Sequence, residues 1–501
     1  MRFTTMRPSQ VGPWEVPASA CCSLAGNLSF ANAPRHLFNC VAQPIGKCQC
    51  GLVHLPPVNE TMELINRSSG ERKRRNVENN RLEPIDRPAH DWYRFVLSYP
   101  PHLVRDYVEQ FSLGRDAVVL DPFCGTGTTP VECKKLEIRS IGIEAHPMAH
   151  FASCTKLDWS IDPDRLEKTA LVIAEAAQES LSAQGIHDDP ESNFSEQGIP
   201  GDVLLGLPEA EMELLLANSI SPLPLHKTLV LLAAIDKANY GRSHFRLALA
   251  KSLVSTIGNL YFGPEVTLGT VKADAPVIST WLSLVVQMTQ DLRALQARAS
   301  TEATVHHADS RDASKFVNLK SIDAVITSPP YPNEKDYTRT TRLEAVLLGF
   351  IRDKKALQAL KRTMLRSNTR GVYKTDSDDG WVASHGEIQR IAAEIEARRI
   401  ELGKTSGFER LYARVTKLYF GGMARHLAEL RPLLKPGASL AYVVGDQASF
   451  LRVMIRTGQL LASLAEELGY TVDRIDLFRT RIATATKEQL REEVVVLRWP
   501  G

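Results

Sequence analysis

The chain has 501 residues, of which 44% are hydrophobic, and a formal net charge of only +2. A chain of this length and composition can bury a large core over two or three domains, which excludes a tail or a linker. The small net charge does not by itself indicate a nucleic-acid partner. No run of 18 or more apolar residues predicts a membrane span.

Residues 1–80 predict a poorly structured N-terminal extension, and a second interpretation is that translation begins at Met62. No sustained apolar core follows the first basic residues, so this start does not resemble a signal peptide. Five of the eight cysteines lie here without the CxxC spacing of a zinc site, so we expect no metal: Cys21, Cys22, Cys40, Cys48 and Cys50. The other three fall in the predicted core, which suits a reducing cytoplasm.

Residues 81–159 begin a nucleotide-binding fold. An apolar run leads into the string DPFCGTGTT at Asp121–Thr129, an order that predicts a strand, a tight turn and a helix. Gly125 and Gly127 allow a ligand to lie against the main chain. Glu144 ends the next apolar run, where nucleotide-binding folds place an acid that binds ribose hydroxyls. The loop departs from the GxGxxG pattern, which disfavours a dinucleotide dehydrogenase.

Residues 160–301 interrupt this fold and predict an inserted helical domain. Three helix-like stretches occupy roughly Pro163–Ser182, Leu225–Phe262 and Ala275–Ala299. A loop rich in Gly, Asp, Ser and Pro near 185–201 joins the first two stretches.

Residues 302–501 form the second part of the fold and carry the string TSPPY at Thr327–Tyr331, directly after an apolar run. This position is the carboxyl end of a strand, the edge where open α/β sheets keep their sites. The Ser328 hydroxyl and the Pro329 carbonyl are hydrogen-bond acceptors, and the proline pair stiffens the loop. The ring of Tyr331 offers a flat face on which a base can stack.

Seven strands are predicted in total. Four end near Leu120, Ile143, His307 and Ile326, and three span Ala438–Val444, Tyr470–Leu477 and Glu493–Leu497. The first five alternate with helical patterns, one of them at about Leu418–Leu434. This order predicts an α/β fold with a mostly parallel sheet and helices on both faces.

Over about 81–159 and 302–501 the chain resembles S-adenosylmethionine-dependent DNA amino-methyltransferases, especially the N4-cytosine type with an SPPY motif. The resemblance implies a seven-stranded, Rossmann-like methyltransferase sheet with S-adenosyl-L-methionine as cofactor. The implied cofactor-binding residues are Asp121, Pro122, Phe123, Gly125, Thr126, Gly127, Glu144 and Asp309. The implied catalytic residues are Ser328, Pro329, Pro330 and Tyr331. The stretch Ser98–Val104 resembles the helix that packs against the cofactor methionine in this family.

The target base is expected to be cytosine, methylated at N4. Adenine-N6 members of the family more often have aspartate in the place of Ser328, so N6 of adenine is the alternative. No Pro-Cys pair occurs, which disfavours cytosine C5 methylation. A tRNA guanine-N2 methyltransferase and a non-catalytic cofactor-binding subunit of a defence system are also open interpretations.

Residues 332–406 are the basic candidate for the DNA-recognition segment. Within them, Lys335–Lys374 contains eleven Lys or Arg residues and three acids, a pattern typical of phosphate contacts. Tyr337, Arg339 and Arg342 are lower-rank candidates for substrate binding. The helical insertion is the other candidate reader of the DNA sequence.

The expected protein is therefore a site-specific methyltransferase of double-stranded DNA, of the kind found in restriction-modification. A separate restriction endonuclease is an optional partner. We expect it in the cytoplasm, associated with the nucleoid and without membrane contact.

Overall fold

The computed structural model describes residues 82–94, 98–190, 204–262, 265–333, 335–482 and 488–501. The extension predicted over 1–80, the alternative start at Met62 and the five cysteines before it lie outside the described residues.

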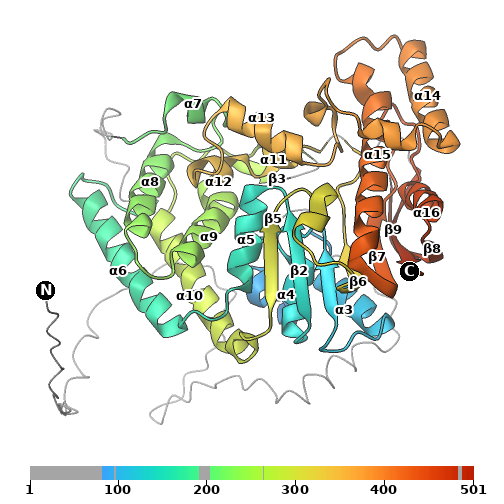
Figure 1. Ribbon diagram of the computed structural model, residues 1–501. Helices are drawn as coiled ribbons and strands as arrows, with labels where there is room; N and C mark the ends of the chain where they lie inside the picture. The colour runs from blue at the N-terminus through green and yellow to red at the C-terminus, as the bar shows by residue number, and fades with distance from the viewer. Residues whose placement is uncertain (1–81, 95–97, 191–203, 263–264, 334, 483–487) are drawn as a thin grey trace, which may run out of the picture. The chain divides into compact units, whose positions relative to one another are not determined.

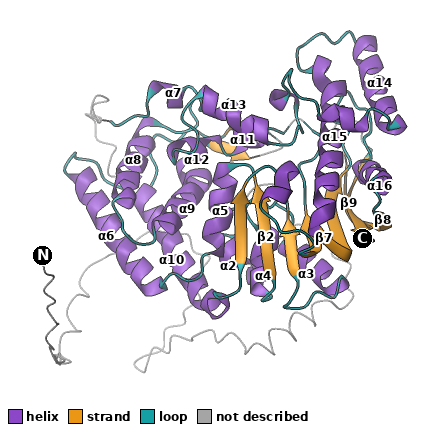
Figure 2. Ribbon diagram, in the orientation of Figure 1, coloured by secondary structure: helices purple, strands orange, loops and turns teal. Residues whose placement is uncertain are grey.

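A seven-stranded sheet organises the described part of the chain (Figures 1 and 2). In spatial order its strands are β5 (Ala303–His307), β2 (Arg139–Glu144), β1 (Val118–Asp121), β6 (Ile322–Thr327), β7 (Leu434–Gly445), β9 (Gln489–Arg498) and β8 (Thr471–Ile482). The first five strands pair in parallel, and β9 runs antiparallel to both β7 and β8. The predicted strands are all present, and the mostly parallel Rossmann-like methyltransferase sheet is confirmed.

Helices flank the sheet and fill the interval between β2 and β5. They are α2 (Arg87–His90), α3 (Pro101–Gln110), α4 (Thr128–Lys135), α5 (Pro147–Leu157), α6 (Pro163–Ser182), α7 (Glu209–Met212), α8 (Pro222–Asp236), α9 (Arg242–Ser252), α10 (Val277–Leu295), α11 (Tyr337–Thr340), α12 (Arg342–Leu347), α13 (Lys354–Thr363), α14 (Gly386–Glu401), α15 (Tyr412–Leu430) and α16 (Thr457–Glu467). Among the described residues, none of these helices combines the length and apolarity that a bilayer crossing needs.

The strands send alternate side chains into two apolar layers. Val119 and Ile326 pack with residues of α3 and α4 on one face of the sheet. Leu120 and Val325 pack with residues of α15 and α16 on the other face. Burial on both faces explains why these strands are continuous apolar runs in the sequence.

The segment between β2 and β5 departs from its prediction in one stretch. Helix α6 has the predicted bounds, but Leu225–Phe262 is divided into α8, α9, a π-helical turn at Leu253–Ile257 and strand β3 (Leu260–Phe262). The break falls at Gly241, whose φ is +69° and where a Cβ would lie 2.3 Å from a leucine side chain of α6. β3 pairs with β4 (Val266–Leu268) in an antiparallel hairpin, so this segment is not purely helical.

One apolar cluster joins α6, α8, α9 and α10 to α5 and α12. The segment therefore shares its core with elements that precede and follow it in the chain. Domain boundaries at 160 and 301 stay a prediction.

Candidate active site

A cavity of about 530 Å³ lies at the carboxyl ends of the parallel strands, a size typical of small-molecule sites. Most of the predicted site residues line it: Pro122, Phe123, Gly125, Thr126, Glu144, Asp309, Ser328, Pro329, Pro330, Tyr331 and Tyr337. Four predicted residues do not line it: Asp121, Gly127, Arg339 and Arg342. Two strings separated by about two hundred residues thus share one cavity, because β1 and β6 are neighbours in the sheet.

A buried hydrogen bond joins the two motifs. Thr327 Oγ1 donates to Asp121 Oδ1 at 2.5 Å, and the Tyr99 hydroxyl donates to Asp121 Oδ2 at 3.1 Å. The amide N–H of Phe123 donates to the same carboxylate at 3.2 Å. Burial raises the pKa of this carboxyl to about 6. Asp121 is fully buried and does not line the cavity. It therefore acts as a structural residue that holds the glycine loop in position through its hydrogen bonds.

The two loop glycines serve different purposes. Gly125 has a φ of +53°, and a Cβ there would meet nothing within 4 Å, so the open space next to it belongs to the cavity. Gly127 has a φ of +86°, and a Cβ there would lie 3.0 Å from Ser153 Cβ on α5. The first glycine leaves room for a ligand, and the second allows α4 and α5 to pack closely.

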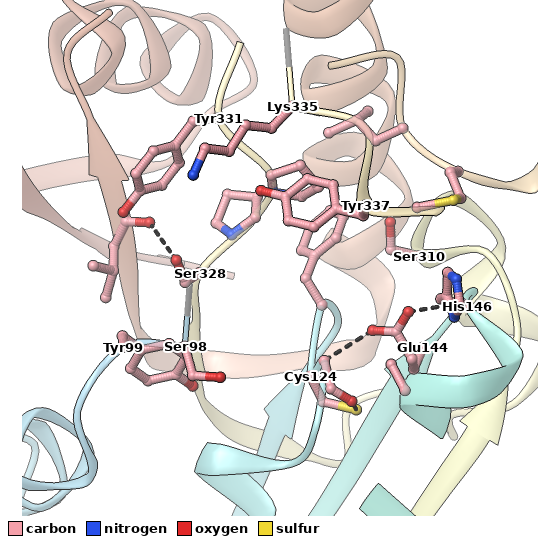
Figure 3. Close-up of a pocket in the computed structure, with 18 of the residues that line it drawn as sticks. Ser98, Tyr99, Cys124, Glu144, His146, Ser310, Ser328, Tyr331, Lys335 and Tyr337 are labelled. Carbon is pink, nitrogen blue, oxygen red and sulfur yellow. Dashed lines mark hydrogen bonds between the residues drawn. The ribbon is translucent and has the colours of Figure 1, made fainter. Parts of the chain in front are cut away.

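Glu144 faces the cavity from the end of β2, with its carboxylate beside the loop (Figure 3). Its oxygens accept hydrogen bonds from the backbone N–H of Gly125 at 2.8 Å and of His146 at 2.7 Å. Burial raises the pKa of this carboxyl to about 7, although both hydrogen bonds oppose the shift. Each oxygen retains a lone pair that can accept a further hydroxyl donor.

Asp309 lines the cavity after β5 and forms an ion pair with Arg311. The guanidinium donates from Nη2 to Asp309 Oδ2 at 2.6 Å and from Nε to Oδ1 at 2.9 Å. On its other side the same guanidinium contacts Asp378, in the segment predicted to read DNA. The predicted adenine-binding acid is therefore held in place by a buried arginine, a role that sequence analysis did not identify.

Ser328 presents an acceptor to the cavity. Its hydroxyl donates to the carbonyl oxygen of Val443 on β7 at 3.1 Å, a bond drawn in Figure 3. A hydroxyl has one proton and two lone pairs, so a proton committed to β7 leaves lone pairs toward the cavity. An N–H group of an amine can donate a hydrogen bond to such a lone pair.

Tyr331 lies beside β7 because that strand has a glycine at the contact. A Cβ on Gly445 would lie 2.8 Å from Tyr331 Cε2. Burial, followed by the charge of Glu492, raises the pKa of the Tyr331 phenol. Burial also raises the pKa of Tyr337 to about 12, so both phenols are neutral at physiological pH.

Arg339 and Arg342 do not reach this cavity. The Arg342 guanidinium donates to the carbonyl of Thr338 at 2.9 Å and to that of Leu214 at 3.3 Å. It ties the start of α12 to the preceding turn and to the segment after α7. Its predicted role in substrate binding receives no support from this geometry.

The basic run is less charged than its composition suggests. At least three of its cations form ion pairs, Lys354 with Glu213, Lys361 with Asp336 and Arg366 with Asp376. Ion pairing neutralises these groups, so fewer cations are left for phosphate contacts than the sequence indicates.

Sequence analysis missed several polar residues on the side of the cavity opposite the glycine loop: Glu265, Gln447, Ser449, Arg479, Arg481 and Glu492. They come from the residue before β4, from the loop after β7 and from the β8–β9 pair. No local motif marks them, because they meet only after β9 inserts between β7 and β8. Lys335 also lines this side and was counted only as part of the basic run.

Within the described ranges, no group of three or more His, Cys, Asp or Glu side chains is arranged to hold a metal ion. The strand order, with β9 reversed between β7 and β8, and the cavity at the carboxyl edge define the class of fold: a Rossmann-like sheet of the methyltransferase type.

Comparisons with known proteins narrow this class. The family described as DNA methylase, of the N6/N4 type, matches residues 59–152, which include the glycine loop and Glu144 but not the Ser328 motif. "Type II methyltransferase M.BsoBI" of Geobacillus stearothermophilus is 25% identical over 443 residues, 82% of this chain and 84% of that protein. "Type II methyltransferase M.AvaI" of a Nostoc species is 30% identical over 190 residues, 36% of this chain and 38% of that protein.

Among solved structures, TrmN from Thermus thermophilus aligns with a TM-score of 0.25 and 12% identity, over 84% of this chain and 54% of that one. A score this low carries no argument. By the family match and the type II relatives, this chain is similar to amino-methyltransferases of the N4/N6 type.

Proposed function

We propose that this chain transfers a methyl group from S-adenosyl-L-methionine to the exocyclic amine of a base extruded from double-stranded DNA, with N4 of cytosine as the favoured target. One observation carries the proposal: the loop Phe123–Thr126 and the string Ser328–Tyr331 line the same cavity. The DNA methylase family match and the type II names of the relatives support DNA as the substrate.

The half of the cavity around the glycine loop fits the cofactor. The ionised Glu144 carboxylate is suited to the two ribose hydroxyls, and the ring of Phe123 offers a surface for the adenine. Asp309, oriented by its arginine, is suited to the adenine amino group. The open space beside Gly125 accommodates the rest of the molecule. When bound, the cofactor supplies an electrophilic methyl group on a sulfonium.

The other half fits an amine nucleophile. The lone pair of an exocyclic amine is delocalised into the ring, and hydrogen bonds from its two N–H groups to Ser328 Oγ and the Pro329 carbonyl would localise it on nitrogen. The nitrogen then forms the new bond to the methyl carbon while the carbon–sulfur bond breaks and its electron pair stays on sulfur. One N–H proton leaves to solvent. The ring of Tyr331 stacks on the base and replaces part of the lost duplex stacking.

Serine at the first motif position supports cytosine N4 over adenine N6. Cytosine C5 chemistry requires a thiolate nucleophile. Cys124 lines the cavity, but burial, followed by the charges of Asp121 and Glu144, raises the pKa of its thiol well above the usual value. This thiol stays protonated and does not support C5 attack.

The test is transfer of a labelled methyl group from the cofactor to duplex DNA and, separately, to tRNA, followed by digestion to nucleosides and mass spectrometry. N4-methylcytosine in DNA is the expected product. N6-methyladenine in DNA would retain the class and change the base. Methylated guanine in tRNA alone would replace the proposal by a tRNA methyltransferase. Cofactor binding without any product would replace it by a non-catalytic subunit.

Association with a restriction endonuclease, location on the nucleoid and the identity of the sequence-reading segment stay predictions. Mapping the methylated positions in DNA incubated with the protein would define the recognition sequence on which later experiments depend.

A further inference from the structure

The target half of the cavity contains a lysine, Lys335, that forms no ion pair with any residue of the described ranges. Lys335 lies four residues after the catalytic string, and its side chain extends toward the ring of Tyr331 (Figure 3). Among the described residues its ammonium forms no ion pair and no hydrogen bond. Its position is well defined, because its backbone N–H donates to Asn333 Oδ1 at 2.9 Å and its carbonyl accepts from Asn368 Nδ2 at 3.1 Å.

Two arginines of β8 line the same side, and they differ in how far they are neutralised. Arg479 donates from Nε to Glu492 Oε2 at 2.5 Å, so its charge is paired. Arg481 lies farther from that carboxylate, at 3.6 Å from Oε1, and its side chain is 43% exposed. Arg481 therefore remains a second cation that is only partly compensated.

Lys335 and Arg481 line the same cavity. Burial is the largest influence on the pKa of Lys335 and lowers it; the charge of Glu265, which raises this pKa, comes next, and the charge of Arg481, which lowers it, comes third. Glu265 and Glu492 are the carboxylates that line this side, and neither forms an ion pair with Lys335. Both cations line the part of the cavity next to the catalytic string, and neither is fully neutralised by a carboxylate, so an anion bound beside them would be stabilised by both charges.

We propose that Lys335 and Arg481 bind the DNA phosphate next to the extruded nucleotide. The inference rests on the proposed function, since it takes DNA as the substrate. When a base turns into the cavity, its own phosphates stay at the mouth, and each must exchange water and counterions for protein groups. These two cations, one from the loop after β6 and one from β8, fix the backbone while the base contacts Ser328 and Tyr331.

The first experiment measures the salt dependence of duplex DNA binding by fluorescence anisotropy, with S-adenosylhomocysteine present. Lys335→Gln and Arg481→Gln should each weaken binding several-fold at low salt and reduce the slope of log Kd against log salt by about 1, the value for one lost phosphate contact. Glu265→Gln, which removes a nearby negative charge, should strengthen binding at low salt.

Lys320→Gln is the matched control, because this exposed lysine precedes β6 at the end opposite the cavity. The slope of log Kd against log salt for Lys320→Gln should equal that of the unchanged protein. Cofactor affinity, measured by calorimetry, should stay unchanged in all four variants. An unchanged affinity would also show that each variant is folded.

A second experiment locates the phosphate. Once the recognition sequence is known, single phosphates around the target base are replaced by uncharged methylphosphonates. Neutralising the phosphate next to the target should weaken binding by the unchanged protein and leave binding by Lys335→Gln nearly unaffected, because the variant has already lost that contact. Equal losses for both proteins at every position would overturn the inference.

The outcomes separate the phosphate contact from the proposed function. If the unchanged protein methylates DNA but Lys335→Gln keeps the full salt slope and loses only kcat, the lysine acts on the base and the phosphate assignment is wrong. If the unchanged protein neither binds nor methylates DNA, the proposed function itself fails.

Discussion

The two halves of the cavity are built in different ways. The cofactor half consists of one continuous loop, Phe123–Gly127, and of acids whose positions are set by nearby hydrogen bonds, such as Glu144. The target half brings together side chains from the loop after β6, from the residue before β4 and from the β8–β9 pair. The first half presents backbone and carboxylates, and the second presents an acceptor hydroxyl, aromatic rings and incompletely paired cations.

This difference corresponds to the ligands that each half is proposed to receive. A cofactor is one fixed molecule, so a short rigid loop at a strand end suffices to bind it. A base within a polyanion requires stacking, amine acceptors and phosphate contacts at once, and no single segment of chain offers all three. Changes confined to one half should therefore affect one ligand and spare the other.

The largest effect is expected from Gly125→Val. The added side chain enters the open space of the cavity and also requires a left-handed backbone at φ +53°, so cofactor affinity should fall by more than about 100-fold. Calorimetry with S-adenosylhomocysteine measures it. Gly114→Val is the control, because Gly114 is exposed, has open space around it and lies before β1, away from the cavity. Normal affinity in Gly125→Val would show that the loop is only structural.

Ser328→Ala should act on the other half alone. Removing the acceptor oxygen should lower kcat for methyl transfer by about 10²–10³, the usual cost of one well-placed polar contact to a reacting group. Cofactor affinity should stay within about twofold, since no cofactor contact is assigned to this hydroxyl. Single-turnover transfer assays give the rate. Ser321→Ala, at the opposite end of β6, is the matched control and should retain full activity.

Tyr331→Ala should weaken binding of the extruded base, because the substitution removes the stacking ring. The lost stacking is worth about 1–3 kcal/mol, so kcat/KM for DNA should fall by about 5- to 150-fold with cofactor affinity unchanged. Tyr331→Phe retains the ring and should keep most of the activity. An equally large loss in Tyr331→Phe would assign the role to the hydroxyl and contradict stacking.

The smallest expected effect is a pH dependence of cofactor affinity. Burial raises the pKa of Glu144 to about 7 in the free protein, and ribose hydroxyls bind the ionised form. Binding must then displace a proton below pH 7, so affinity should decline as pH falls from 8 to 6, by at most about tenfold per unit. Calorimetric titrations across this range measure the decline. Glu144→Gln cannot ionise and should give a weaker affinity with a flatter pH profile.

Much of the fold could be predicted because its signals are local. A strand buried on both faces, such as β6, is a short apolar run. All seven predicted strands are present in the structure, including the less buried edge strands β5 and β8. The predictions were less accurate where local signals were ambiguous. The helical pattern over Leu225–Phe262 did not reveal the left-handed turn at Gly241, and β7 begins at Leu434 rather than at the predicted Ala438. Gly241 is required there because its backbone is left-handed and because α6 leaves no room for a Cβ.

The same distinction applies to the site. The glycine loop and the string Ser328–Tyr331 are each contiguous in the sequence. The sequence alone therefore predicted most of the residues that line the cavity, and it predicted that both motifs follow the ends of strands. Only the tertiary structure decided the rest. Pairing of β1 with β6 buried Asp121 as a link between the motifs, and insertion of β9 between β7 and β8 brought Arg481 to the same cavity as Lys335. Contacts between residues more than a hundred positions apart depend on strand order, and no short-range pattern encodes strand order.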